Sequence, residues 1–289
     1  MSEIVHQTVS DFEIAPLAPY RNMRSQTERP ASGIFVAEGE KVVRRLIESQ
    51  LRVVSLVLPE KWLRVYEPIL RTRPETQIDA FTADKSVLEK LVGLSMYQGV
   101  LAVGCIPTAS SIDQLWNASR PQRPRLFLAV EGLSSGENLG GIVRTAAAMG
   151  VDGLMVGETC CHPYLRRSVR GSMGTVFKMP FHLSENLPDT LRELGRRGCH
   201  IVGAHPHTDR LSLNQVDLRR DACIVMGSEG DGLTVAARDA CHELAAIPMA
   251  NEVDSLNVGN AAAVFLYEAF RQNALTTSGT HADSPLPRA

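Results

Sequence analysis

Long apolar runs are missing from this sequence of 289 residues, and none approaches the roughly 20 residues that a membrane-spanning helix needs. The N-terminal segment also lacks the apolar core of a secretory signal peptide. Hydrophobic content of 44% and charged content of 21% are typical of globular proteins. We therefore expect a cytoplasmic protein with no membrane partner.

Cysteines spaced as metal ligands are missing as well. The six cysteines, at positions 105, 160, 161, 199, 223 and 241, form no C-x-x-C pair. Three of them precede a histidine, but neighbouring residues of an extended segment point to opposite faces, so such a dipeptide does not make a pair of ligands. We expect reduced, mostly buried thiols and no metal site.

The sequence has no strong excess of positive charge, since the formal net charge is −2. Overall charge therefore gives no reason to expect nucleic-acid binding. Arginines are nevertheless bunched, as at Arg44 and Arg45 and at Arg166, Arg167 and Arg170. Such clusters are usually ordinary solvated faces, so they favour a phosphate-rich partner only modestly.

A dinucleotide-binding loop is also lacking. The glycines of residues 136–141 follow an apolar strand pattern and precede a helix, but they do not have the G-x-G-x-x-G spacing. A nicotinamide-dependent oxidoreductase is therefore only a distant alternative.

The first half of the chain has the pattern of a small α/β domain. A short strand after Gly33 leads into a helix with Val42, Val43, Leu46 and Ile47 on one side. Three further strands and a short helix are predicted at residues 53–59, 77–82, 99–106 and 84–91 respectively.

The second half alternates strands and helices from Arg125 onward, which favours a mostly parallel sheet covered on both faces. We predict an α/β protein of two domains. The expected segments are an irregular arm at 1–30, the small domain at 31–106, a linker at 107–124 rich in proline and serine, the larger domain at 125–275, and a disordered tail at 276–289.

The segment from Ala245 to Phe270 combines a polar loop with a helix. Val258, Ala261, Ala262, Phe265 and Ala269 fall at helical spacing, and Asn257 stands at the expected N-cap. Backbone N–H groups at such a helix start can hold a small polar ligand. An ordinary strand, loop and helix would give the same pattern.

Three motifs in order carry a family resemblance: NLGGIVRTAAAMG at 138–150, IVMGSEGDGL at 224–233, and IPM followed by SLNVGNAAAVFLYEA at 247–269. Together they resemble the motifs of the SpoU family of RNA ribose 2′-O-methyltransferases, part of the SPOUT superfamily. The small domain, with FVAEGEKVVRRLIES and YQGVLAV, is similar to the substrate (RNA)-binding domain fused to many of these enzymes.

The resemblance implies a fold, a cofactor and an assembly. It implies an α/β-knot methyltransferase domain with a deep trefoil knot, S-adenosyl-L-methionine as cofactor, and a homodimer with active sites at the subunit interface. It also implies an RNA substrate. The additional RNA-binding domain favours ribosomal RNA over transfer RNA.

The motifs also imply site residues. The catalytic candidates are Asn138, Arg144, Glu229, Ser255 and Asn257. Because a guanidinium is almost never neutral, we expect Arg144 to clamp a phosphate beside the target ribose and to favour the developing alkoxide rather than to act as a literal base. Asn138 would orient the hydroxyl or Arg144, or cap its own helix. The expected cofactor contacts are Met226, Gly227, Gly230, Ile247, Met249, Leu256 and Ala261, and the expected RNA contacts are Arg44, Arg45, Arg166, Arg167 and Arg170.

Three departures from the family pattern favour an outlying branch. Ser135-Gly136-Glu137 stands where an Asp-Pro pair is usual, Ser228 replaces an asparagine, and Gly259-Asn260 replaces small or β-branched residues. They motivate an alternative hypothesis, in which the chain is a non-catalytic RNA-binding protein that keeps the fold.

Overall fold

The computed structural model describes residues 2–11, 13–21, 33–92, 99–118, 123–206, 211–251 and 253–277. The chain forms two compact units. The first contains Met1–Thr108, Ser135–Arg144 and Cys161–Lys178, and the second contains Ala109–Ser134, Thr145–Cys160 and Met179–Ala289. Two segments of the expected larger domain are thus grouped with the first unit. Within the described residues, no helix is long and apolar enough to cross a membrane.

The first unit is built on a mixed five-stranded sheet with the order β1-β4-β3-β5-β2. The strands are β1 (Glu3–Thr8), β2 (Ile34–Glu38), β3 (Val53–Leu58), β4 (Gln77–Thr82) and β5 (Leu101–Cys105). Strand β5 runs antiparallel to both of its neighbours, whereas β1, β3 and β4 are parallel. The predicted strands of this domain are confirmed.

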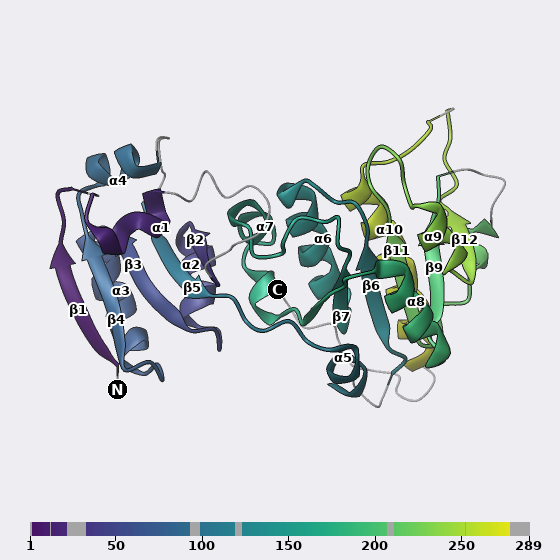
Figure 1. Cartoon of the computed structure of the whole chain (residues 1–289), viewed down its shortest axis with the longest axis horizontal. Helices are drawn as coiled ribbons and strands as arrows, with labels where there is room; N and C mark the ends of the chain where they lie inside the picture. The colour runs from purple at the N-terminus through teal and green to yellow at the C-terminus, as the bar shows by residue number, and fades with distance from the viewer. Residues whose placement is uncertain are drawn as a thin grey trace. The chain divides into compact units, whose positions relative to one another are not determined.

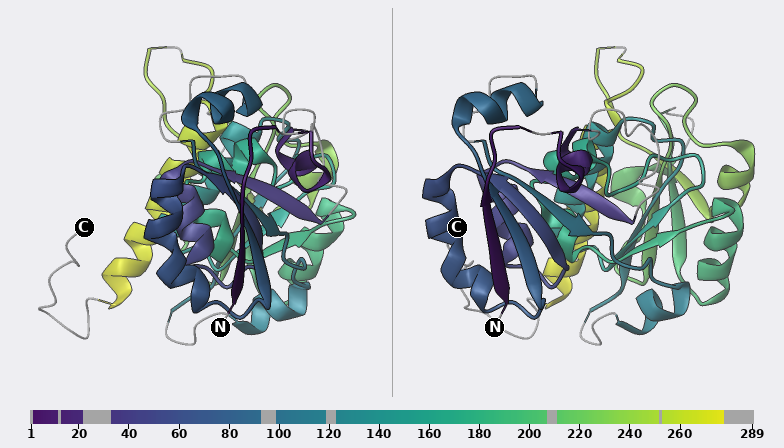
Figure 2. Two further views of the ribbon diagram at one scale, coloured as in Figure 1. Left: turned by 90° about the vertical axis from the view of Figure 1, so that its left-hand side faces the viewer. Right: turned by 60° about the vertical axis from the view of Figure 1, so that its left-hand side comes forward.

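The expectation of an irregular arm at residues 1–30 was wrong where the structure describes it. Strand β1 pairs with β4 along its whole length and forms the edge of the sheet (Figure 2). The strand is mostly exposed, so it is held by backbone hydrogen bonds and leaves no apolar alternation to recognise. The turns η1 (Ala15–Leu17) and α1 (Ala18–Arg21) bury Leu17 and Tyr20 completely, and the Tyr20 hydroxyl lies 2.8 Å from Ser55 Oγ.

Helices α2 (Glu40–Ile47), α3 (Glu60–Arg71) and α4 (Lys85–Val92) follow strands β2, β3 and β4. All four apolar residues predicted for the face of α2 are buried. Helix α7 (Arg166–Gly171) packs against β2, and the ring of Phe35 lies 4.9 Å from Tyr164 and 5.4 Å from Phe177, centroid to centroid. These contacts explain why residues 161–178 belong to the first compact unit.

The second unit is built on a seven-stranded sheet with the order β10-β12-β9-β11-β6-β7-β8 (Figure 1). Every neighbouring pair is parallel, which confirms the predicted parallel sheet. The strands are β6 (Leu126–Val130), β7 (Gly153–Val156), β8 (Phe181–Leu183), β9 (His200–Ala204), β10 (Leu211–Ser212), β11 (Ala222–Met226) and β12 (Glu243–Ala246). The trefoil knot is not tested by these pairings and stays a prediction.

The expected linker at 107–124 contains a helix, α5 (Ile112–Ala118), and is therefore not an extended spacer. Ser111 starts it, because the Ser111 hydroxyl accepts a hydrogen bond from the N–H of Gln114 and the Gln114 side chain accepts one from the Ser111 N–H. Leu115 is buried in the core of the second unit. Ser111, one of the serines that suggested a linker, is therefore the cap of this helix.

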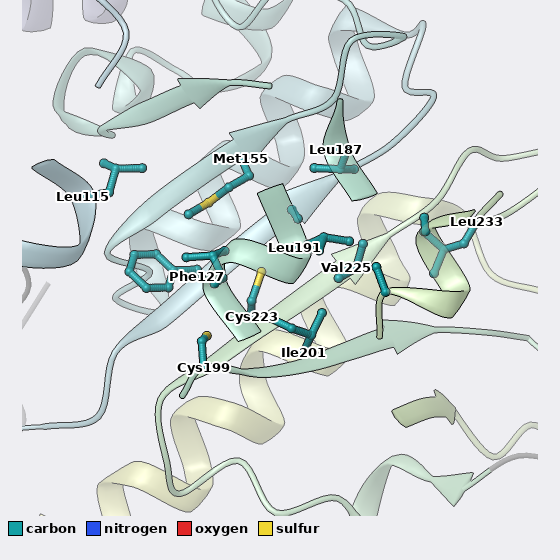
Figure 3. Packing of buried hydrophobic residues seen from close by; sticks show 14 residues of the cluster. Leu115, Phe127, Met155, Leu187, Leu191, Cys199, Ile201, Cys223, Val225 and Leu233 are labelled. Carbon is teal, nitrogen blue, oxygen red and sulfur yellow. The ribbon is translucent and has the colours of Figure 1, made fainter. Parts of the chain in front are cut away.

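The core of the second unit lies between the sheet and helices α5, α8 (Leu187–Arg196) and α9 (Val235–Asp239). Figure 3 shows Leu187 and Leu191 of α8 directed toward Phe127, Met155 and Val225 of the strands. All six cysteines have free thiols and four of them are buried, which agrees with the predicted reduced thiols. Cys199 and Cys223 belong to this core.

The remaining α-helices of the described residues carry the first and third predicted motifs. They are α6 (Gly136–Ala148) and α10 (Val258–Thr277), with the short η3 (Thr175–Lys178) and η4 (Leu213–Gln215) elsewhere. Helix α10 extends two residues into the expected tail, and residues 278–289 lie outside the described ranges. Of the predicted apolar stripe of α10, Val258, Ala262, Phe265 and Ala269 are buried.

Candidate active site

The second motif forms a tight loop directly after β11. A Cβ atom on Gly227 would lie 2.2 Å from the carbonyl carbon of Gly232, so only glycine fits there. The N–H of Ser228 donates to the carbonyl oxygen of Gly232 at 3.0 Å, which closes the loop on itself. Glu229, Gly230 and Asp231 form its exposed tip.

The third motif leads from β12 to the start of α10. Asn257 is the N-cap, as predicted, because its Oδ1 accepts a hydrogen bond from the N–H of Gly259 at 2.9 Å. Its Nδ2 lies 3.5 Å from Oε1 of Glu229, so the same side chain also reaches the second motif. Asn257 therefore connects the helix start with the tip of the glycine loop.

The two motifs enclose a cleft of about 380 Å³ in the second unit. All seven residues expected to contact a cofactor line this cleft, and so do Glu229 and Ser255. The carboxyl ends of parallel strands meet at one edge of a sheet, which brings the loops after β9, β11 and β12 together. The lining residues are Ala204, His205, Pro206, Met226, Gly227, Ser228, Glu229, Gly230, Asp231, Gly232, Leu233, Arg238, Ile247, Met249, Asp254, Ser255, Leu256, Val258, Ala261 and Phe265.

The cleft combines an apolar interior with a polar rim. Met226, Leu233, Val258 and Phe265 are buried side chains that provide an apolar wall. Three carboxylates and one guanidinium lie among the lining residues, from Glu229, Asp231, Asp254 and Arg238. This arrangement suits a small ligand with an apolar ring system and both positive and negative groups.

Several lining residues were not predicted. Ala204, His205 and Pro206 follow β9, a strand that the sequence did predict, so the rule that ligands bind at the carboxyl ends of parallel strands could have indicated them. Arg238 comes from α9 and carries no motif signal.

The first-motif residues lie in α6. Arg144 is exposed on this helix. The suggestion that Asn138 caps the helix was wrong: the helix begins earlier, at Gly136, because the hydroxyl of Ser135 accepts the N–H of Asn138 at 3.3 Å. Gly140 is needed where α6 meets α7, since a Cβ atom there would lie 2.4 Å from the carbonyl oxygen of Ser168.

Among the described residues, four of the five arginines expected at RNA have protein partners, the exception being Arg167. Arg166 makes a two-pronged ion pair with Glu38, with nitrogen–oxygen distances of 2.6 and 2.8 Å, and both side chains are largely buried. Arg44 pairs with Glu48 at 3.0 Å, and Arg45 donates to the carbonyl oxygen of Met173. Arg167 and Arg170 are exposed, the latter at 3.8 Å from Glu38.

Comparison with known proteins identifies the family of this chain. A model of the SpoU rRNA Methylase family matches residues 125–267. An uncharacterized tRNA/rRNA methyltransferase of Mycobacterium tuberculosis is 31% identical over 283 residues, which are 95% of each chain. This chain belongs to the SpoU rRNA Methylase family. The resemblance of the three motifs is thereby confirmed.

Other SpoU relatives have more specific names. The 23S rRNA (guanosine-2′-O-)-methyltransferase RlmB of Ralstonia nicotianae is 30% identical over 73% of this chain and 84% of its own. The SpoU methyltransferase AviRb from Streptomyces viridochromogenes, solved in complex with the cofactor AdoMet, is 25% identical, with a TM-score of 0.74 over 88% of this chain and 97% of its own. An AdoMet-bound rRNA methyltransferase from Sinorhizobium meliloti, at 24% identity, has the same fold, with a TM-score of 0.78 over 92% of this chain and 98% of its own.

Proposed function

We propose that this protein is an S-adenosyl-L-methionine-dependent methyltransferase that methylates a ribose 2′-hydroxyl in RNA. The observation that carries the proposal is the cleft in which the second and third SpoU motifs meet. Family membership and the AdoMet complex of AviRb support the choice of cofactor. The name of the Ralstonia relative supports the 2′-hydroxyl as the acceptor.

The cleft residues fit this cofactor. Met226, Ile247, Met249, Leu256 and Ala261 supply apolar surface for an adenine ring, while Gly227 and Gly230 allow close approach to the main chain. S-adenosylmethionine supplies a methyl group that is already activated by a sulfonium. The carboxylates at the rim are suited to a positively charged ligand.

The chain's own residues would orient the acceptor and stabilise the charge that develops on it. A ribose 2′-hydroxyl is a weak acid, so the enzyme must hold it in line and help its proton to leave. Arg144 clamps the neighbouring phosphate and stabilises the alkoxide, and Asn138 orients the hydroxyl or Arg144. Ser255 and Asn257 hold the polar side of the site, and Asn257 keeps the carboxylate of Glu229 in place, as their 3.5 Å contact indicates.

The enzyme works as a homodimer in this proposal, with the active sites at the subunit interface. Helix α10 supports this, because Val264, Tyr267 and Phe270 lie at a spacing of three residues and are 39%, 55% and 45% exposed. A second copy of the chain would bury this stripe. Arg144 of one subunit would then serve the cleft of the other.

Mixed dimers test this arrangement. Gly230 lines the cleft and has open space around its Cβ position, so a Trp side chain there should obstruct the cleft without displacing the backbone. Arg144→Ala and Gly230→Trp are each inactive in this account. Equal mixing should restore about a quarter of wild-type activity, because half of the dimers are mixed and each has one intact site. No recovery in verified mixed dimers would place Arg144 and its cleft in the same subunit.

The proposed substrate is ribosomal RNA rather than transfer RNA, acted on in the cytoplasm and without a metal ion. The small domain of the first unit supports a folded RNA target, and Arg167 and Arg170 are exposed cations available for phosphates. The RNA roles of Arg44, Arg45 and Arg166 also remain part of the proposal, although these three, like Arg170, already have a protein partner.

A methyl-transfer assay tests the function. Wild-type protein should transfer labelled methyl groups from S-adenosylmethionine to ribosomal RNA, and Arg144→Ala should not. Mapping of 2′-O-methyl groups in cells that lack the protein should reveal at least one lost site. Absence of transfer by the wild type, with RNA binding intact, would favour the alternative that the chain is a non-catalytic RNA-binding protein.

A further inference from the structure

The carboxylate of Glu131 is buried directly beyond the end of β6 and is only 7% exposed. Its Oε2 accepts the N–H of Thr234 at 2.8 Å, and its Oε1 accepts the Thr234 hydroxyl at 2.8 Å. The N–H of Glu131 donates to the carbonyl oxygen of Met226 at 2.9 Å. Glu131 thus contacts the chain on both sides of the second-motif loop without lining the cleft.

Thr234 is the end point of this loop and the beginning of α9. Its hydroxyl donates to Glu131 and at the same time accepts the N–H of Ala237 at 3.2 Å, so it caps the helix. Gly227 fixes the other end of the loop. The exposed tip, at Glu229, Gly230 and Asp231, is therefore held between two anchored ends.

Gly132 adds a second contact beside Glu131. It adopts a φ of +68°, and a Cβ atom there would lie 2.9 Å from the Cβ of Ser228. The backbone turn after Glu131 consequently packs against the first residue of the loop. Two adjacent residues, Glu131 and Gly132, therefore contact the loop at Thr234 and at Ser228.

A buried carboxylate costs free energy unless it is hydrogen-bonded, and charge-assisted hydrogen bonds are stronger and more directional than neutral ones. We propose that Glu131 is a positioning residue for methyl transfer: by gripping Thr234 it holds the Gly227–Leu233 loop in the shape that binds the methyl donor. The proposal rests on the proposed function of the cleft. It assigns Glu131 to donor affinity and not to the chemical step.

Isothermal titration with S-adenosylhomocysteine tests this role in the full-length protein. Glu131→Gln keeps the volume but turns an amide N–H₂ toward one of the two donors, so donor affinity should fall about tenfold, as expected for one charge-assisted hydrogen bond. At saturating S-adenosylmethionine, kcat should stay within about threefold of wild type, because only interactions that differ in the transition state change kcat. KM for the donor should rise with the dissociation constant.

A second pair of variants keeps the test decisive if Glu131→Gln folds poorly. Thr234→Ser retains the hydroxyl and should bind S-adenosylhomocysteine like wild type, whereas Thr234→Val should lose about as much affinity as Glu131→Gln. Combining Glu131→Gln with Thr234→Val should cost little more than either change alone. Additive losses would overturn the proposal, because the two residues would then act separately.

Glu158 provides a matched control. It follows β7, the neighbouring strand, and its Oε2 accepts the N–H of Leu187 at the start of α8 at 3.0 Å, yet it does not line the cleft. Glu158→Gln should leave S-adenosylhomocysteine affinity unchanged. An equal affinity loss in both Gln variants, or a Glu131→Gln variant that loses stability but binds like wild type, would reduce Glu131 to a structural role. Failure of the wild type to bind at all would instead refute the proposed function.

Discussion

Gly227→Ala should open the second-motif loop, and its effect can be worked out from the structure. The added Cβ atom would lie 2.2 Å from the carbonyl carbon of Gly232, whereas ordinary contacts begin at 3.4 Å. The facing backbone must therefore retreat by about 1 Å, which costs about 1–3 kcal/mol in a well-packed site. Loss of the Ser228–Gly232 hydrogen bond adds about 1 kcal/mol.

Gly230→Ala is the control in the same loop, because its Cβ position meets open space. Urea unfolding should show a loss of about 2–4 kcal/mol for Gly227→Ala, and for Gly230→Ala a change within about 0.5 kcal/mol. Titration with S-adenosylhomocysteine should show binding lost in Gly227→Ala. Wild-type stability and affinity in Gly227→Ala would refute the reasoning, since the loop would then tolerate a shape that these contacts forbid.

Three further predictions concern other parts of the molecule. Arg166→Ala should lower the free energy of unfolding by about 2 kcal/mol, because it leaves the largely buried Glu38 carboxylate with only its 3.8 Å contact to Arg170. The exposed Arg167→Ala should change it by less than about 0.5 kcal/mol, and urea titration of both compares them. Tyr267→Glu should yield monomers in analytical ultracentrifugation, and an unchanged dimer would exclude α10 from the interface. Burial lowers the pKa of His200 below its ordinary 6.5, so the folded state disfavours its protonated ring: stability should fall as pH drops below about 6.5, and His200→Gln should flatten that slope in pH-dependent unfolding curves.

Elements that bury one face were predictable from the sequence. The four apolar residues of α2 and the stripe of α10 follow helical periodicity, and the structure buries all four in α2 and four of the five in α10. The buried strands β6 and β11 were predicted because continuous apolar runs are typical of a parallel sheet. In such elements the pattern and the burial have the same cause.

Elements stabilised in other ways were missed. Strand β1 is held by backbone hydrogen bonds at a sheet edge, and α5 lies in a segment whose serines and prolines suggested a linker. Helix α3 was not predicted, although it buries Leu63, Tyr66 and Leu70, because Pro68 interrupts its pattern. In each of these three elements the local sequence favours a structure other than the one observed.

The residues of the candidate site were likewise predictable only in part. Its motif residues were predictable because the three motifs resemble those of the SpoU family, and all seven expected cofactor contacts line one cleft. Arg238 and Glu131 were not predictable, since only the folded sheet brings α9 and the end of β6 to the loop. The partners of Arg166 and Arg45 were hidden for the same reason, as each contact spans 128 residues of sequence.

The central claim is that the second and third motifs hold a methyl donor between them. A crystal structure of the protein grown with S-adenosylhomocysteine tests it most directly. The account predicts the ligand in the cleft, between the loop at Gly227–Leu233 and the segment from Ile247 to Ala261. Well-defined ligand density at another place, with this cleft empty, would contradict it.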